Sequence, residues 1–134
     1  MASVDTNVLV RLLTGDDAVQ SGEAREYVRR AEHEGNRLYV PLTVTLELEW
    51  VLRSRFGYNK DQVLIALSSL LKTREFDFQD ETAVENALNS YRQNRVDFAE
   101  CLHAGCAASA DQLPFLTFDR SAAHIPGAQL VGSS

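Results

Sequence analysis

Hydrophobic residues along this chain follow two patterns, which predict short strands separated by longer helices. Short apolar runs bounded by turn residues are typical of buried strands, and apolar positions that repeat every three or four residues are typical of one buried helix face. The runs predict strands at residues 1–5, 38–40, 74–78, 114–118 and 129–131. The spacing predicts a first helix that reaches Leu13, then helices at residues 19–34, 43–55, 60–71, 81–94 and 97–110.

Residues that typically end or cap helices support these boundaries, and the order of the elements indicates the fold class. Gly35 and Gly57 stand where two helices should stop, and Asn59 stands where the next should be capped. Strands that alternate with helices are typical of a parallel sheet covered on both faces. Because no linker, repeat or low-complexity stretch interrupts the sequence, we expect residues 1–134 to form a single α/β domain. Its short central sheet should have about five strands.

Two acidic residues follow predicted strands. Ligands of open parallel sheets bind beyond the carboxyl ends of the strands, and Asp5 and Asp119 each lie at such an end, where they could converge. A cap or turn is the alternative role for Asp5, but Thr6 or Asn7 is available to cap the first helix. A turn role is also open for Asp119. Thr117 should point to the same side of its strand as Asp119 and could orient a water or a carboxylate.

Helical geometry separates two neighbouring glutamates. Residues three and four apart share a helix face, so Glu47 shares its face with apolar residues that include Trp50 and Val51. We therefore expect Glu47 on the packed face, where a lone carboxylate is costly unless it is paired. Glu49 lies four residues before Arg53, and this spacing predicts a surface ion pair. Glu47 is the better functional candidate of the two.

Asp97 and Glu100 have two interpretations. The pattern Asp-x-x-Glu before an apolar run resembles a capping box, in which both side chains bond free backbone N–H groups. Local sequence slightly favours this interpretation. The same spacing also places both carboxylates on one face at the positive end of a helix, which stabilises their ionised forms. Asp97 could both cap the helix and face a metal ion.

Acids that a fold gathers at strand ends need a cation to remain ionised together. Asp5, Glu47, Asp97, Glu100 and Asp119 form such a set, and their hard oxygen ligands predict a divalent ion and phosphodiester hydrolysis. The net charge of −6 argues against non-specific nucleic-acid binding through bulk charge, but not against a nuclease. Arginine far outnumbers lysine, which suits bidentate phosphate contacts, but a GC-rich genome is the more ordinary explanation of this bias.

Other side chains carry weaker signals. Cys101 and Cys106 are five residues apart on one predicted helix, a spacing that indicates free thiols in a reducing cytoplasm. His103 follows Glu100 by three residues, and packing in a helix interface is its commoner role. The sequence contains no apolar run of membrane-spanning length and no signal-peptide pattern, so we expect a cytoplasmic protein without a membrane partner.

Four motifs in order resemble the PIN-domain ribonucleases, and most closely the VapC-type toxins of bacterial toxin–antitoxin pairs. The matching segments are DTNVLVR at 5–11, PLT at 41–43 with ELEWVLR at 47–53, DFAECLH at 97–103 and TFD at 117–119. Each is short, but together they span nearly the whole chain. Asp5, Glu47 and Asp119 match three of the family's metal-site acids. Asp97 matches the first acid of the late helix, and Glu100 occupies a second position where the family more often has Asp.

The resemblance implies a three-layer α/β/α PIN fold and an endoribonuclease that depends on Mg²⁺ or Mn²⁺. Asp5, Asp97, Glu100 and Asp119 are the expected metal ligands, Glu47 joins them as a catalytic residue, and either Asp97 or Glu100 is the direct ligand of that pair. Candidates for RNA contact are Arg11, Arg53, Arg55 and Thr117. For each arginine a solvated charged face is an equally good interpretation.

The resemblance also implies partners. We expect a homodimer, an RNA substrate and a small VapB-type antitoxin, with DNA bound only indirectly through that antitoxin. The alternative is a non-catalytic PIN-like binding module, supported by Glu100. A phosphotransfer domain that uses Asp5 as nucleophile is disfavoured, because haloacid-dehalogenase-type enzymes have a second Asp where this chain has Asn7.

Overall fold

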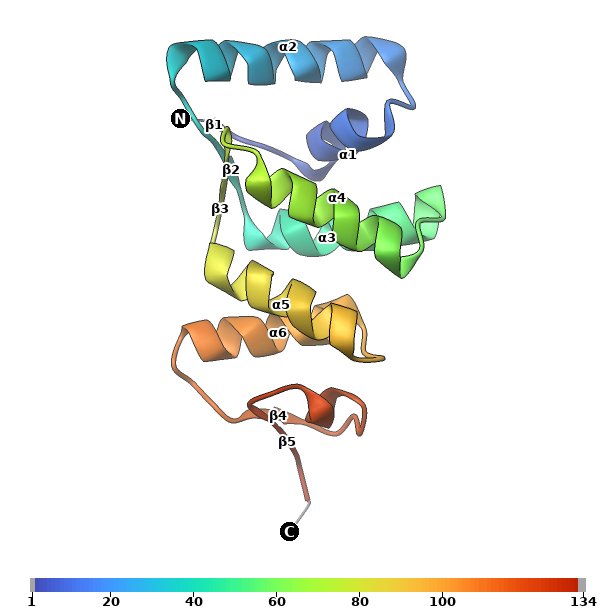
Figure 1. The fold of residues 1–134 in the computed structure, drawn as a ribbon, viewed down its shortest axis with the longest axis vertical. Coiled ribbons are helices and arrows are strands. Elements are labelled where there is room, and N and C mark those ends of the chain that lie inside the picture. Colours follow the sequence, from blue (N-terminus) through green and yellow to red (C-terminus); the bar gives the residue numbers. More distant parts are fainter. Residues whose placement is uncertain (1, 133–134) are drawn as a thin grey trace. The chain divides into compact units, whose positions relative to one another are not determined.

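The computed structural model describes residues 2–132, which form two compact units that meet in the sequence between Gln79 and Asp80 (Figure 1). Each unit is described by itself. The single domain expected for residues 1–134 stays a prediction.

A three-stranded parallel sheet organises the first unit. The strands are β1 (Ala2–Ser3), β2 (Leu38–Val40) and β3 (Phe76–Phe78), in the order β1-β2-β3. Leu38 pairs with Ala2 on one side and with Phe76 on the other. Parallel neighbours need long crossovers, and here each crossover contains two helices.

The four helices of the first unit begin and end close to the predicted residues. Their bounds are α1 (Thr6–Thr14), α2 (Ala18–Glu34), α3 (Leu42–Phe56) and α4 (Lys60–Lys72). Gly35 and Gly57 end α2 and α3 in left-handed conformation, and Asn59 caps α4 in a capping box with Gln62. These are the residues that the sequence predicted as helix ends and a helix cap, so local chemistry determines these boundaries.

The core of the first unit is aliphatic. α3 packs against α1 and α4, and α4 packs against β3. Figure 1 shows α3 and α4 running side by side. Leu9, Val40, Leu48, Leu52 and Leu67 are fully buried. This packing holds the first turn of α1 beside α3, which brings together two of the predicted site residues.

A helix pair and a small sheet form the second unit. Its elements are α5 (Glu81–Gln93), α6 (Phe98–Ser109), β4 (Phe115–Thr117), the 3₁₀ turn η1 (Ala122–His124) and β5 (Ala128–Leu130). β4 and β5 pair in parallel, with Leu116 opposite Gln129. The two helices pack closely because Gly105 lets α6 approach α5: a Cβ at this position would lie 2.7 Å from the carbonyl oxygen of Ala83.

The α/β class with parallel strands is confirmed, but the prediction of one sheet of about five strands is wrong in detail. The described residues form one three-stranded and one two-stranded sheet. The strands are only two or three residues long, and so short a run of apolar residues does not reveal its pairing partner. Between residues 2 and 132, no helix combines the length and the apolar character needed to cross a bilayer.

Candidate active site

Asp5 lies in the loop between β1 and α1. Its extended backbone makes it the N-cap of α1, and its Oδ1 accepts a hydrogen bond of 2.8 Å from the backbone N–H of Thr6. The expectation that Thr6 or Asn7 would be the cap is therefore wrong, because the chain is still extended at Asp5 and turns helical at Thr6. The side chain is exposed, and Oδ2 makes no hydrogen bond within residues 2–132. Capping orients this carboxylate and leaves one oxygen available.

Thr6 connects Asp5 to Glu47, which lies on α3. The Thr6 hydroxyl is buried and donates a hydrogen bond to Oε1 of Glu47. This role of Thr6 does not follow from the sequence. The only signal was a hydroxyl residue directly after a strand-end acid, and nothing in the sequence pairs it with a residue 41 positions away.

The predicted faces of α3 are reversed. Glu47 is exposed, whereas Glu49 is 3% exposed and forms its predicted ion pair with Arg53, with 2.8 Å between Oε2 and Nε. The error came from Trp50, which is 50% exposed and does not mark the packed face. The packed face instead contains Thr45 and Leu48. Glu47 remains a candidate because its carboxylate is accessible and held by a buried hydroxyl.

Asp97 and Glu100 stand at the N-terminus of α6. Asp97 is the N-cap by backbone conformation, but its side chain makes no capping hydrogen bond, so the capping-box interpretation is wrong. Glu100 lies in the first turn and is half-buried. Neither carboxylate accepts a hydrogen bond from the residues that the structure describes. Both lie where the partial positive charge of the helix N-terminus favours negative charge, and their oxygens are available to a ligand.

Asp119 follows β4 after one intervening residue. Its Oδ1 accepts hydrogen bonds from the backbone N–H groups of Ser121 at 2.8 Å and Ala122 at 3.3 Å, so the turn role is present. The Asp119 N–H in turn donates to Oγ1 of Thr117 at 3.0 Å. Thr117 therefore orients the acid through its backbone. Asp119 is exposed, and its Oδ2 makes no hydrogen bond in the described part of the chain.

The five predicted acids share one property. Asp5, Glu47 and Asp119 each hold one carboxylate oxygen in a local hydrogen bond and keep the other without a partner, while Asp97 and Glu100 keep both. Hard carboxylate oxygens of this kind suit Mg²⁺ or Mn²⁺. Asp5 and Glu47 belong to the first unit and the other three to the second. Within residues 2–132, no three His, Cys, Asp or Glu side chains form a ready-made metal cluster.

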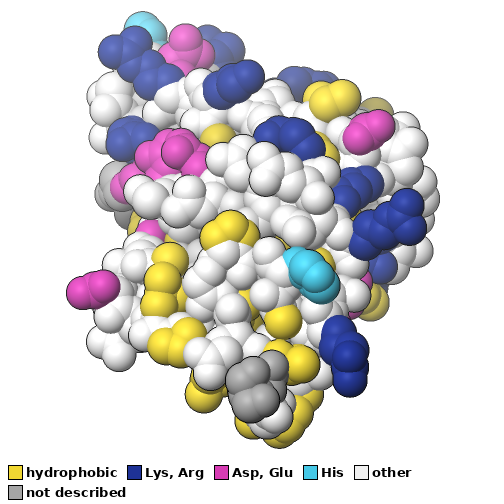
Figure 2. All heavy atoms as spheres, turned by 60° about the horizontal axis from the view of Figure 1, so that its bottom comes forward, with side chains coloured by type: hydrophobic (Ala, Val, Ile, Leu, Met, Phe, Trp, Pro, Cys, Tyr) yellow, Lys and Arg dark blue, Asp and Glu magenta, His cyan; other side chains and the backbone are white. Residues whose placement is uncertain are grey.

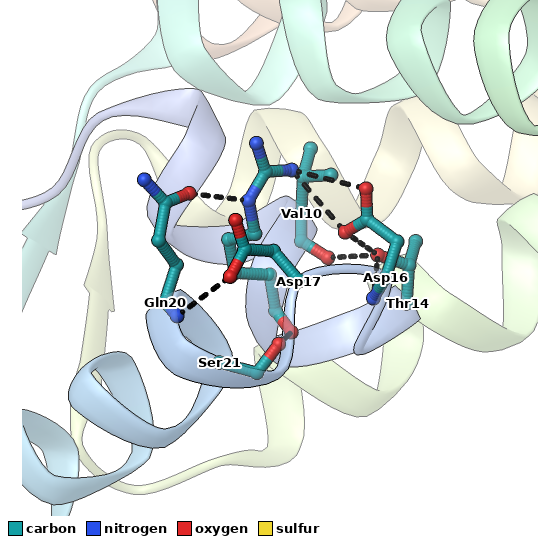
Figure 3. Close-up of polar contacts among 7 residues, drawn as sticks. Val10, Thr14, Asp16, Asp17, Gln20 and Ser21 are labelled. Carbon is teal, nitrogen blue, oxygen red and sulfur yellow. Dashed lines mark hydrogen bonds and ion pairs between the residues drawn. The ribbon is translucent and has the colours of Figure 1, made fainter.

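The arginines predicted to contact RNA differ in their surroundings. Arg11 is engaged by its own unit: its Nε donates to Oε1 of Gln20 at 2.7 Å, and its Nη1 lies 3.2 Å from Oδ1 of Asp16. Figure 3 shows Asp16 and Gln20 within the network that joins the end of α1 to the start of α2. Arg53 is paired with Glu49. Arg55 is exposed, and its side chain has no partner among residues 2–132.

A groove of about 560 Å³ lies between β1, α1 and α2 of the first unit. Val4, Val8 and Val28 supply apolar lining, and Arg11 and Glu23 supply charged groups. Asn7 also lines the groove, two residues after Asp5. Sequence analysis did not identify this surface.

The histidine and cysteines of α6 do not form a metal site. His103 is exposed and tilted against the ring of Phe115, so the expected packing in a helix interface is wrong. Neither cysteine forms a disulfide, as predicted; Cys101 is buried and Cys106 half-buried. Burial raises the pKa of the Cys106 thiol, and the nearby negative charge of Asp80 raises it further. Cys106 is therefore a neutral structural thiol at ordinary pH.

Comparison with known proteins identifies the family of this chain. The model of the PIN domain family matches residues 2–128. The chain is also similar to a VapC ribonuclease from Aquifex aeolicus, with 23% identity over 103 residues that cover 76% of this chain and 75% of the relative. A family match across nearly the whole chain, together with parallel strands and acids in the family's order, shows that this protein belongs to the PIN domain family.

Proposed function

We propose that this protein is a metal-dependent endoribonuclease toxin of the VapC type. Membership of the PIN domain family and similarity to a VapC ribonuclease support a nuclease. The observation that carries the proposal is the state of the acids: all five predicted carboxylates keep an oxygen without a hydrogen bond, and none is consumed in an ion pair. Carboxylate oxygens without a protein partner are available to coordinate a metal ion.

Asp5 and either Asp97 or Glu100 would hold the ion directly, and Glu47 and Asp119 would complete its coordination directly or through water. A bound Mg²⁺ or Mn²⁺ would lower the pKa of a water molecule and stabilise charge on the scissile phosphate. The chain's own residues supply preorganisation. Thr6 fixes Glu47, the turn after β4 fixes Asp119, and the N-terminus of α6 places the other two acids together at the positive end of the helix.

Hydrolysis in this site would join water to phosphorus as the bond to the 3′ oxygen breaks. The products would then carry a 5′ phosphate and a 3′ hydroxyl. Arg55 is the best placed of the predicted arginines to bind an RNA phosphate, because Arg11 and Arg53 already have carboxylate partners.

The proposed biological setting is a toxin–antitoxin pair in the cytoplasm. A VapB-type antitoxin would inhibit the homodimeric toxin, and DNA would be bound only through that antitoxin. The groove between β1, α1 and α2 offers an apolar lining beside the Asp5 loop. We assign it to an apolar segment of the antitoxin, and an arginine of the same partner would neutralise the acids.

Inducible expression in a bacterial host, with mapping of RNA 5′ ends, tests the activity. The parent chain should arrest growth and create discrete 5′-phosphate ends, while Asp5→Asn should do neither. Asp61→Asn is the matched control, because Asp61 is an exposed acid in the first turn of α4 and outside the proposed site. It should behave as the parent does.

The same experiment addresses the alternative of a non-catalytic module. Folded parent protein that causes no arrest and creates no new ends would favour that alternative. Glu100→Asp would then be the next variant, because Glu100 is the one clear departure from the family pattern. If Glu100→Asp cleaves RNA and the parent does not, the additional methylene group of Glu100 explains why the parent is inactive.

A further inference from the structure

The loop that carries Asp119 also presents an aromatic side chain to solvent. Phe118 is 82% exposed, which makes it the most exposed large hydrophobic residue between residues 2 and 132. An isolated exposed leucine or valine is ordinary. A fully presented phenyl ring next to a proposed catalytic acid calls for a functional explanation.

The backbone on both sides of Phe118 is held in place. The carbonyl of Thr117 accepts from the N–H of Val131 at 2.8 Å, and the Thr117 hydroxyl accepts from the N–H of Asp119 at 3.0 Å. The carboxylate of Asp119 then closes the following turn on Ser121. Phe118 therefore projects from an ordered turn, and binding at its ring would cost little backbone entropy.

The two sides of the small sheet differ. Phe115 and Thr117 point to the side where Phe115 contacts His103 of α6. Leu116 and Phe118 alternate with them and point to the other side, where Leu116 is 59% exposed. Figure 2 turns the lower part of Figure 1, where β4 and β5 are labelled, towards the reader and shows hydrophobic side chains on that surface. The open side of β4 is therefore apolar and accessible.

Charged neighbours indicate which ligand this surface takes. Phe118 is followed in the sequence by Asp119 and Arg120, both exposed, and the Arg120 side chain has no partner among residues 2–132. Two adjacent charges are unfavourable in the dry centre of a protein interface, where charged residues are depleted. An aromatic ring next to an arginine is instead typical of sites for unpaired nucleotides, where a base stacks and the cation binds phosphate.

We propose that Phe118 is a stacking platform for an unpaired RNA base and that Arg120 binds the adjoining phosphate, so that the substrate strand is held beside Asp119. This inference rests on the proposed ribonuclease function and deepens it, since it requires the substrate to be single-stranded at this position. The net charge of −6 gives the chain little bulk attraction for RNA. Local stacking would therefore contribute a large share of the affinity.

Binding is measured best in an Asp5→Asn background, so that RNA is not cleaved. The probe is a short fluorescent oligoribonucleotide of mixed sequence, single-stranded or annealed to its complement, and the readout is fluorescence anisotropy. Phe118→Ala should weaken single-strand binding by about fivefold or more, the range seen for base-stacking aromatics. Phe118→Leu should weaken it similarly, and Phe118→Trp should preserve it. The parent should prefer the single strand to the duplex.

Leu116→Ala is the matched control, because it removes apolar area from the same side of β4 without removing a ring. It should leave RNA affinity unchanged. Parent-like affinity in Phe118→Ala or Phe118→Leu would overturn the proposal. Equal losses of RNA affinity in Leu116→Ala and Phe118→Ala would also overturn it. A change of oligomeric state in Phe118→Ala, measured by light scattering, would overturn it as well, because the surface would then be a contact between copies of the chain.

Cleavage assays on chains with Asp5 intact separate this inference from the proposed function. If the parent cleaves RNA and Phe118→Ala has an unchanged KM, the stacking inference fails and the nuclease stands. If the parent never cleaves but its RNA binding depends on the Phe118 ring, the nuclease proposal fails and the stacking surface stands.

Discussion

Thr6 is the residue on which the orientation of Glu47 depends. Its buried hydroxyl is the sole hydrogen-bond partner that residues 2–132 offer to this exposed carboxylate. We expect Thr6→Val to lower the RNA cleavage rate by about tenfold or more, as losses of groups that orient metal ligands commonly do. The thermal midpoint should change little, because valine fills the same volume and Glu47 remains hydrated.

Thr6→Ser is the control for this prediction, since it keeps the hydroxyl and should retain most of the activity. A Thr6→Val variant with parent-like cleavage kinetics would show that Glu47 needs no orientation. A loss of folding in Thr6→Val, measured by circular dichroism, would reveal a structural role instead.

Asp80 controls the reactivity of a thiol in the second unit. Burial, and then the charge of Asp80, raise the pKa of Cys106 above its ordinary value. At pH values below the ordinary thiol pKa, both the folded and the unfolded chain keep the Cys106 proton, and the free energy of unfolding does not depend on this group. Above the ordinary pKa the unfolded chain loses the proton first, so the free energy of unfolding should fall as the pH rises towards the folded-state pKa. Asp80→Asn keeps the cap of α5 but removes the charge, so it should lower this pKa.

Peptide mapping of alkylated protein across a pH series measures the change at Cys106 separately from Cys101. Alkylation of Cys106 should become appreciable at lower pH in Asp80→Asn than in the parent. Asp111→Asn is the matched control, since Asp111 is an exposed acid that also has a positive φ and does not act on Cys106. Identical profiles for Asp80→Asn and the parent would contradict the electrostatic cause.

At the scale of elements, two helical glycines should respond in opposite directions to the same change. Gly105→Ala would place a Cβ 2.7 Å from the carbonyl oxygen of Ala83, so α5 and α6 must move apart, at a cost of about 1–3 kcal/mol. A Cβ added at Gly22 in α2 would meet no neighbouring atom within 4 Å, and Gly22→Ala should stabilise the protein by about 0.5–1 kcal/mol. Urea unfolding of both variants measures the difference, and equal effects would refute it.

Elements also show how far the sequence alone could lead. Helix ends at Gly35 and Gly57 and the cap at Asn59 were predictable because each depends on one residue's own conformation or side chain. The division of the strands into two sheets was not, because pairing joins distant segments. The packed face of α3 was misassigned for the same reason: whether Trp50 or Glu49 is buried depends on what α1 and α4 place against the helix.

The sequence suggests candidate acids for the site but not the surroundings of those acids. Asp5 and Asp119 could be identified from their position after apolar strands, and the family pattern added Glu47, Asp97 and Glu100. Their hydrogen-bond partners were not predictable, because the Thr6 hydroxyl reaches Glu47 across 41 residues. The absence of a capping bond at Asp97 is likewise a property of side-chain geometry that the Asp-x-x-Glu spacing does not contain.

At the scale of the whole molecule, catalysis and folding should respond differently to metal removal. The core consists of buried aliphatic side chains such as Leu9, Leu48 and Leu67, which need no ion to pack. EDTA should therefore stop RNA cleavage while circular dichroism stays unchanged, and Mg²⁺ or Mn²⁺ should restore cleavage. Cleavage that continues in EDTA would contradict the proposed chemistry.

Metal binding should also stabilise the folded chain, because the net charge of −6 includes the uncompensated acids of the proposed site. An ion that binds only the folded state adds about 2.7 kcal/mol at one hundred times its Kd, so Mg²⁺ should raise the thermal midpoint of the parent. Asp5→Asn should show a smaller rise, and Asp61→Asn should match the parent. Equal rises in all three would mean that Mg²⁺ only screens the general negative charge and that Asp5 is not a ligand.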